Sequence, residues 1–176
     1  NQANTQLEIT MSDEKVLTKE IAEQFIADED SVDLSEFTAI EDDAAAETLG
    51  KGDSWEMNLS GLTSLSDGVA EILSKFDRGP LQLNGITCLS DAVAEILSKA
   101  RCRSLEFNGV TSLSDAAAES LAKFNGLDGI SLNGLTSISD ASAESLGNVE
   151  RRGHLYLNGL TSLSDAAATS LSPGWH

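Results

Sequence analysis

The chain has 176 residues, with 29 acidic and 11 basic side chains and a net charge of −18. This length suits one domain with its own core, and the negative charge argues against anionic partners, namely nucleic acids and membrane surfaces. The sequence has no apolar run long enough to insert into a membrane, and its two cysteines, Cys88 and Cys102, form neither a zinc motif nor a disulfide framework.

The first part of the chain is its most acidic part. Residues 1–53 hold 15 acidic residues but only three lysines. Within them, ITMSDEKVLTKEIAEQFIA (9–27) is a weak copy of the pattern that the rest of the chain repeats, so we interpret 1–30 as a degenerate N-terminal repeat or cap. We expect its charges to be solvated; the alternative is a binding site for a basic partner or for cations.

Residues 31–171 contain six copies of one pattern, which predicts a repeat protein. The first copy, VDLSEFTAIEDDAAAETL (32–49), has one extra residue. The next five align without gaps through their leading halves: MNLSGLTSLSD (57–67), LQLNGITCLSD (81–91), LEFNGVTSLSD (105–115), ISLNGLTSISD (130–140) and LYLNGLTSLSD (155–165). With the degenerate copy this gives about seven repeats in a single domain, 1–176, which ends in a short tail, 172–176.

Each copy reads as a strand, a turn and a helix. The opening apolar–polar–apolar triplet predicts a short strand with one buried face. Asn-Gly or Ser-Gly then predicts a turn in which glycine supplies a positive φ. Ser-Asp predicts the start of an Ala-rich helix, because either side chain can cap it.

Two columns of polar residues recur through the copies. We attribute the asparagines to the turns: Asn84, Asn108, Asn133 and Asn158. The recurring aspartates invite a calcium interpretation, but adjacent helices lie about 8–10 Å apart, too far for their carboxylates to share one ion. We therefore interpret the aspartates as helix caps.

One unit cannot bury its own apolar face, so the copies must stack. Paired strands lie about 4.8 Å apart and packed helices about 8–10 Å apart, so the helix side of the stack must be longer. We therefore predict an α/β solenoid in the form of a right-handed horseshoe arc, with a parallel β-sheet on the concave face and α-helices on the convex face.

The copies MNLSGLTSLSD and ISLNGLTSISD resemble the cysteine-containing type of leucine-rich repeat, whose pattern is L-x-L-S-G-C-x-x-I-T-D followed by a helix. Aliphatic residues replace the family's buried cysteine: Leu62, Ile86, Val110, Leu135 and Leu160. The Ala-rich stretches are also similar to repeat proteins of planctomycete-like bacteria. The resemblance covers nearly the whole chain and implies binding of proteins or peptides on the concave face, although this fold serves many roles.

The outward positions of the expected strands give the candidate binding residues: Asp33, Asn58, Gln82, Glu106, Ser131, His154 and Tyr156. Among them, Tyr156 belongs to the residue types enriched in protein-binding hot spots. The alternative interpretation is that these positions are only the solvated face of a sheet.

We find no catalytic, metal or cofactor motif, because every Ser and Asp recurs for structural reasons and two histidines are too few. The sequence therefore predicts a non-enzymatic module that binds a protein or peptide. The alternative is a structural protein whose solenoids stack end to end, since neither end has an obvious cap. A chain that starts at Asn1 is expected of a secreted or cell-surface protein whose signal peptide was removed, with the cytoplasm or a trimmed fragment as alternatives.

Overall fold

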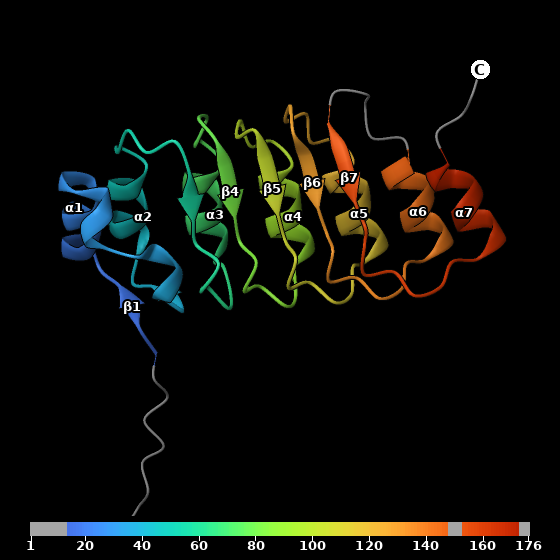
Figure 1. Ribbon diagram of the computed structural model, residues 1–176, viewed down its shortest axis with the longest axis horizontal. Coiled ribbons are helices and arrows are strands. Elements are labelled where there is room, and N and C mark those ends of the chain that lie inside the picture. Colours follow the sequence, from blue (N-terminus) through green and yellow to red (C-terminus); the bar gives the residue numbers. More distant parts are fainter. Residues whose placement is uncertain (1–13, 148–152, 173–176) are drawn as a thin grey trace, which may run out of the picture.

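The computed structural model describes residues 14–147 and 153–172, so most of the predicted tail and the first part of the predicted N-terminal repeat lie outside it. Strands form one layer of the stack and helices form a second layer behind it (Figure 1). Successive units lie side by side in chain order, and the strands of the main sheet are parallel. These features confirm the predicted repeat solenoid of α/β units.

Five short strands form one parallel sheet in the order β3-β4-β5-β6-β7. They are β3 (Met57–Asn58), β4 (Pro80–Gln82), β5 (Ser104–Glu106), β6 (Gly129–Ser131) and β7 (His154–Tyr156). The helices are α1 (Lys19–Ala27), α2 (Asp43–Leu49), α3 (Asp67–Leu73), α4 (Asp91–Leu97), α5 (Asp115–Leu121), α6 (Asp140–Gly147) and α7 (Asp165–Leu171). Strands pair in register by whole repeats, as Leu81 does with Leu105, so equivalent residues form rows along the stack.

A continuous aliphatic core lies between the two layers. The last residue of the apolar–polar–apolar triplet is 0% exposed in four consecutive repeats, as the pattern predicts: Leu59, Leu83, Phe107 and Leu132. Cys102 lies in this core, where burial raises the pKa of its thiol to about 12, whereas Cys88 is exposed. Cys102 is therefore a core residue and Cys88 a surface thiol.

The second repeat differs from the prediction, because residues 32–34 do not form a strand. Two 3₁₀ helices, Glu29–Ser31 and Leu34–Glu36, occupy this part of the chain. Asp33 caps the second of them by accepting a hydrogen bond from the Ser35 N–H at 2.9 Å. A short carboxylate side chain that binds its own neighbouring backbone favours a local turn over strand pairing.

The strands of the first two repeats lie at a different place in the unit. β1 (Val16–Leu17) pairs in parallel with β2 (Ala39–Ile40), and these segments precede α1 and α2 directly. The row of backbone pairing that β1 and β2 begin continues into later repeats as single hydrogen bonds, such as that from the Thr63 N–H to the Thr38 carbonyl at 3.2 Å. The N-terminal units are thus joined along the edge where helices begin, rather than along the main sheet.

The turn glycines are required for a reason other than the predicted one. Among the described residues only Gly129 has a positive φ, at 87°. The Asn-Gly glycines instead lie against the backbone of the preceding repeat: a Cβ on Gly109 would be 2.1 Å from the carbonyl oxygen of Asn84. The expectation of a positive φ is therefore wrong, and close stacking of backbone excludes a side chain here.

The recurring asparagines join neighbouring repeats, which turn formation alone does not explain. Asn84 Oδ1 accepts a hydrogen bond from the backbone N–H of Asn108 at 3.0 Å. Asn108 Oδ1 accepts from Asn133 at 3.1 Å, and Asn133 Oδ1 accepts from Asn158 at 2.9 Å. Because an unpaired backbone donor away from water costs about 1–3 kcal/mol, this ladder helps to fix each repeat on the next.

The recurring Ser-Asp pairs form another ladder along the helix starts. The serine is the cap, since its hydroxyl accepts from the backbone N–H three residues later in α3, α4, α5 and α7, so the interpretation of the aspartates of these helices as caps is wrong. The aspartate accepts a hydrogen bond from the serine of the following repeat, as from Ser114 Oγ to Asp91 Oδ1 at 2.5 Å. Ser139 and Ser142 donate to Asp115 in the same way and lower the pKa of its carboxyl group.

Candidate functional site

Most of the candidate residues lie on one side of the main sheet. The strand register places five of them in a single row: Asn58, Gln82, Glu106, Ser131 and Tyr156. His154 follows Pro80, Ser104 and Gly129 in the adjacent row. We call these two rows the strand face. Asp33 is not part of it, because it caps a 3₁₀ helix, and its predicted strand position is wrong.

An open cavity of about 430 Å³ lies on the strand face. Its lining residues are Pro80, Ser104, Glu106, Asp128, Gly129, Ile130, Ser131, Asn133 and Tyr156. Three of the candidate residues, Glu106, Ser131 and Tyr156, therefore surround one hollow. The sequence placed them in one row but contained no pattern that predicts the hollow.

A glycine lines this cavity where the neighbouring strands carry side chains. Gly129 pairs with Ser104 on one side and with His154 on the other. Its φ of 87° disfavours other residues, and a Cβ there would be 1.9 Å from the carbonyl oxygen of His154. The row of side chains is interrupted at this position as a result, and Tyr156, 44% exposed, lies on the next strand.

Two carboxylates give the cavity its charge. Asp128 accepts hydrogen bonds from the Arg103 guanidinium at 2.8 and 3.0 Å, which lowers the pKa of the Asp128 carboxyl group. Glu106 accepts one long hydrogen bond, 3.5 Å from Asn84 Nδ2, and no ion pair joins it to another described residue. Glu106 is therefore the carboxylate that a cationic group of a ligand can reach without displacing an arginine.

His154 and Tyr156 form an exposed aromatic pair on β7, the last strand of the sheet. Their ring centroids are 6.0 Å apart and the rings are tilted by 53°. Aromatic side chains supply contact area at a low entropic cost, because few torsions must be fixed on binding. This pair is the part of the strand face best suited to packing against a partner.

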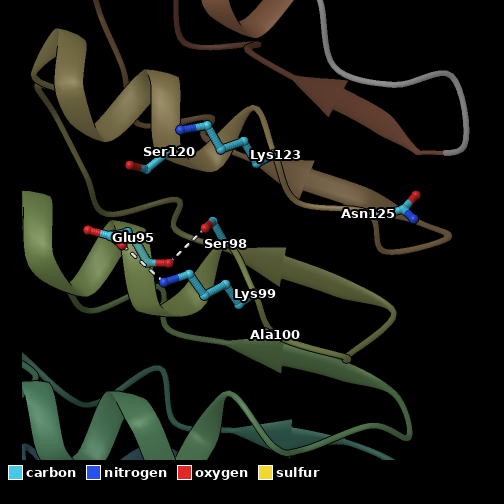
Figure 2. A pocket seen from close by; sticks show the side chains of 7 residues that line it. All are labelled: Glu95, Ser98, Lys99, Ala100, Ser120, Lys123 and Asn125. Carbon is cyan, nitrogen blue, oxygen red and sulfur yellow. Dashed lines mark hydrogen bonds and ion pairs between the residues drawn. The ribbon is translucent and has the colours of Figure 1, made fainter.

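A further cavity, of about 590 Å³, lies on the helix side between the ends of α4 and α5 (Figure 2). Its charged groups are paired within their own units, Lys99 with Glu95 at 3.0 Å and Lys123 with Glu119 at 3.3 Å. Figure 2 shows Lys99 reaching back to Glu95, while Ser120 and Lys123 come from the following unit. This hollow is the space between successive helices, and the charges around it already have partners.

Sequence reasoning missed a group of residues in the loops that lead from helices to strands. Trp55 and Leu127 are 63% and 59% exposed, and together with Arg101 and Arg103 they line a cavity of about 410 Å³. Arg103 binds Asp128 in the adjacent loop. The sequence signal that could have revealed Trp55 is its departure from the repeat. The strand register places Gly79, Arg103 and Asp128 at the equivalent positions of the following repeats, so no tryptophan recurs there.

No protein-family model, curated protein or solved structure matches this chain. Within residues 14–147 and 153–172, no three or more His, Cys, Asp or Glu side chains are grouped so that they hold a metal ion. The helices of these two ranges are too short or too polar to cross a membrane.

Proposed function

We propose that the chain is a leucine-rich-repeat solenoid of the cysteine-containing type, with about seven repeats, and a non-enzymatic module that binds a protein or peptide. The observation that carries this proposal is the strand-face cavity, around which Glu106, Ser131 and Tyr156 meet. The strand–turn–helix order of the five copies from β3 onward supports the family. A horseshoe curvature, which we propose from the unequal spacing of strands and helices, makes the strand face concave.

The lining of the cavity favours an extended segment of a partner. Glu106 offers a carboxylate without an ion pair to the described residues, and Tyr156 offers an exposed ring. A ligand that places a basic side chain beside Glu106 and an apolar side chain against Tyr156 matches both groups. The net charge of −18 adds a long-range attraction for such a basic segment.

The test is a selection of phage-displayed random peptides on the immobilised chain, followed by titration of the selected peptides. We expect Tyr156→Ala and Glu106→Ala each to weaken binding of the selected peptides at least about ten-fold, the size of effect that a hot spot shows. Lys75→Ala is the control, because this exposed lysine follows α3 on the helix layer. If all three variants bound the peptides as tightly as the unaltered chain, the strand face would be excluded as the binding surface.

The C-terminal end favours a second candidate function, end-to-end assembly. Leu157 and Leu160 are only partly buried and Ala168 is exposed. Their counterparts in the preceding repeat, Leu132, Leu135 and Ala143, are 0% exposed. The last described repeat thus presents the half of an inter-repeat contact that a further repeat covers elsewhere in the stack.

Leu160→Glu distinguishes this second candidate from the first. If copies stack through this end, the unaltered chain forms assemblies that grow with concentration, and the variant stays small because a charge replaces the apolar contact. Static light scattering and electron microscopy measure both outcomes. Assemblies that are equally large in the unaltered chain and the variant would contradict end-to-end stacking through this face.

A further inference from the structure

Six residues in the helix-to-strand loops of four consecutive repeats form what we call the loop patch: Trp55, Asp77, Arg78, Arg101, Arg103 and Leu127. All six line the cavity of about 410 Å³. Trp55 and Leu127 are the two most exposed large apolar residues of the described chain, at 63% and 59%. Exposed tryptophan beside arginine is the composition that distinguishes interface hot spots from ordinary surface.

The indole of Trp55 is held in place although it is exposed. Trp55, Gly79, Arg103 and Asp128 follow one another in a single row. Gly79 has no side chain to separate its neighbours, and the Arg103 guanidinium lies over the Trp55 ring, 5.9 Å from its centroid. Asp128 binds that guanidinium at 2.8 and 3.0 Å, so the group that lies over the indole is fixed before any partner arrives.

The loop patch holds three arginines and one aspartate, and the carboxylates of Asp53 and Asp128 beside it bring the local charge to zero in a chain whose net charge is −18. Two of its arginines are paired, Arg78 with Asp53 at 2.6 Å and Arg103 with Asp128. Asp77 and Arg101 occupy equivalent positions of adjacent loops, and neither side chain has an ion pair or hydrogen bond to another described residue. The patch therefore offers one free charge of each sign.

These residues are arranged so that the patch is complementary to itself. Along the stack the order is Trp55, Asp77, Arg101 and Leu127, one from each of four successive loops. A two-fold axis between the second and third loops places Trp55 opposite Leu127 of another copy and Asp77 opposite Arg101, each contact occurring twice. We propose that the loop patch is the interface of a symmetric homodimer of this chain.

The test reverses the two free charges, one at a time. At about 150 mM salt, where long-range repulsion is screened beyond about 8 Å, sedimentation equilibrium of the unaltered chain should show monomers and dimers. Asp77→Arg alone and Arg101→Asp alone should each weaken association at least about ten-fold, because each variant brings like charges together in both contacts. An equimolar mixture of the two variants should associate again, since both contacts of the mixed dimer then join opposite charges.

Glu71→Arg is the control, because it reverses an exposed charge on α3 outside the patch, and it should leave association unchanged. Trp55→Ala should weaken association at least about ten-fold. Circular dichroism verifies that each variant is folded. A chain that stays monomeric up to about 1 mM, a dimer insensitive to Asp77→Arg, or folded single variants that fail to associate when mixed would each overturn the proposal.

Discussion

Phe107→Ala is expected to lower the free energy of unfolding by about 3–5 kcal/mol, as truncation of a buried phenylalanine does. Phe107 is 0% exposed and lies in the middle of the core row, with Leu83 and Leu132 at the equivalent positions of the neighbouring repeats. Because repeats are stabilised by their neighbours, a void here weakens two inter-repeat contacts at once. Urea denaturation followed by circular dichroism measures the change.

Phe107→Leu is the matched control, since leucine occupies this position in the repeats on both sides. We expect it to cost less than about 1.5 kcal/mol, because the volume lost is small and the apolar character is kept. A loss of less than about 1 kcal/mol for Phe107→Ala would contradict a continuous close-packed core at this point.

The sequence predicted the architecture because one pattern recurs with its apolar spacing intact. The triplets around Leu81, Leu105 and Ile130 form adjacent parallel strands, and Ser-Asp begins each helix from α3 onward. The pattern constrains the units from β3 onward to the same local structure, and burial of each unit's apolar face then requires stacking. Agreement between local preference and packing made this part predictable.

Prediction was wrong where a local cap replaces strand pairing, and it was incomplete where a contact between repeats decides the structure. The capping aspartate at position 33 replaces the second expected strand with a 3₁₀ helix. The asparagine column was correctly placed in the turns, but its bonds to the following repeat, such as Asn108 to Asn133, depend on a register that only stacking defines. The same holds for the aspartates that accept from the serine of the next unit.

The candidate site was predictable only in part. The alternation of apolar and polar residues predicts that Glu106, Ser131 and Tyr156 share one face, and the strand register places them in a row. The hollow among them depends on Gly129, whose conformation is not encoded in the repeat. Trp55 and Leu127 lie in loops that differ from copy to copy, so no periodic pattern brings them together.

Gly109→Ala is expected to lower the free energy of unfolding by about 1–3 kcal/mol or more, because the added Cβ overpacks a contact between two backbones. The Cβ would lie 2.1 Å from the Asn84 carbonyl oxygen and 2.9 Å from that of Ile86. Neither oxygen can move without separating two repeats, and the hydrogen bond from the Asn108 N–H to Asn84 Oδ1 lies in the same contact. Urea denaturation measures the loss.

Gly50→Ala supplies the comparison that separates crowding from conformational freedom. Gly50 follows α2 with a right-handed backbone, φ −64°, and a Cβ there would come no closer than 3.6 Å to another atom. Alanine restricts the unfolded chain at both positions, so Gly50→Ala should be neutral or stabilise the fold by up to about 1 kcal/mol. Gly109 also has no positive φ. If Gly109→Ala had the same free energy of unfolding as Gly50→Ala, the result would contradict a close approach of successive repeats at the Asn-Gly turns.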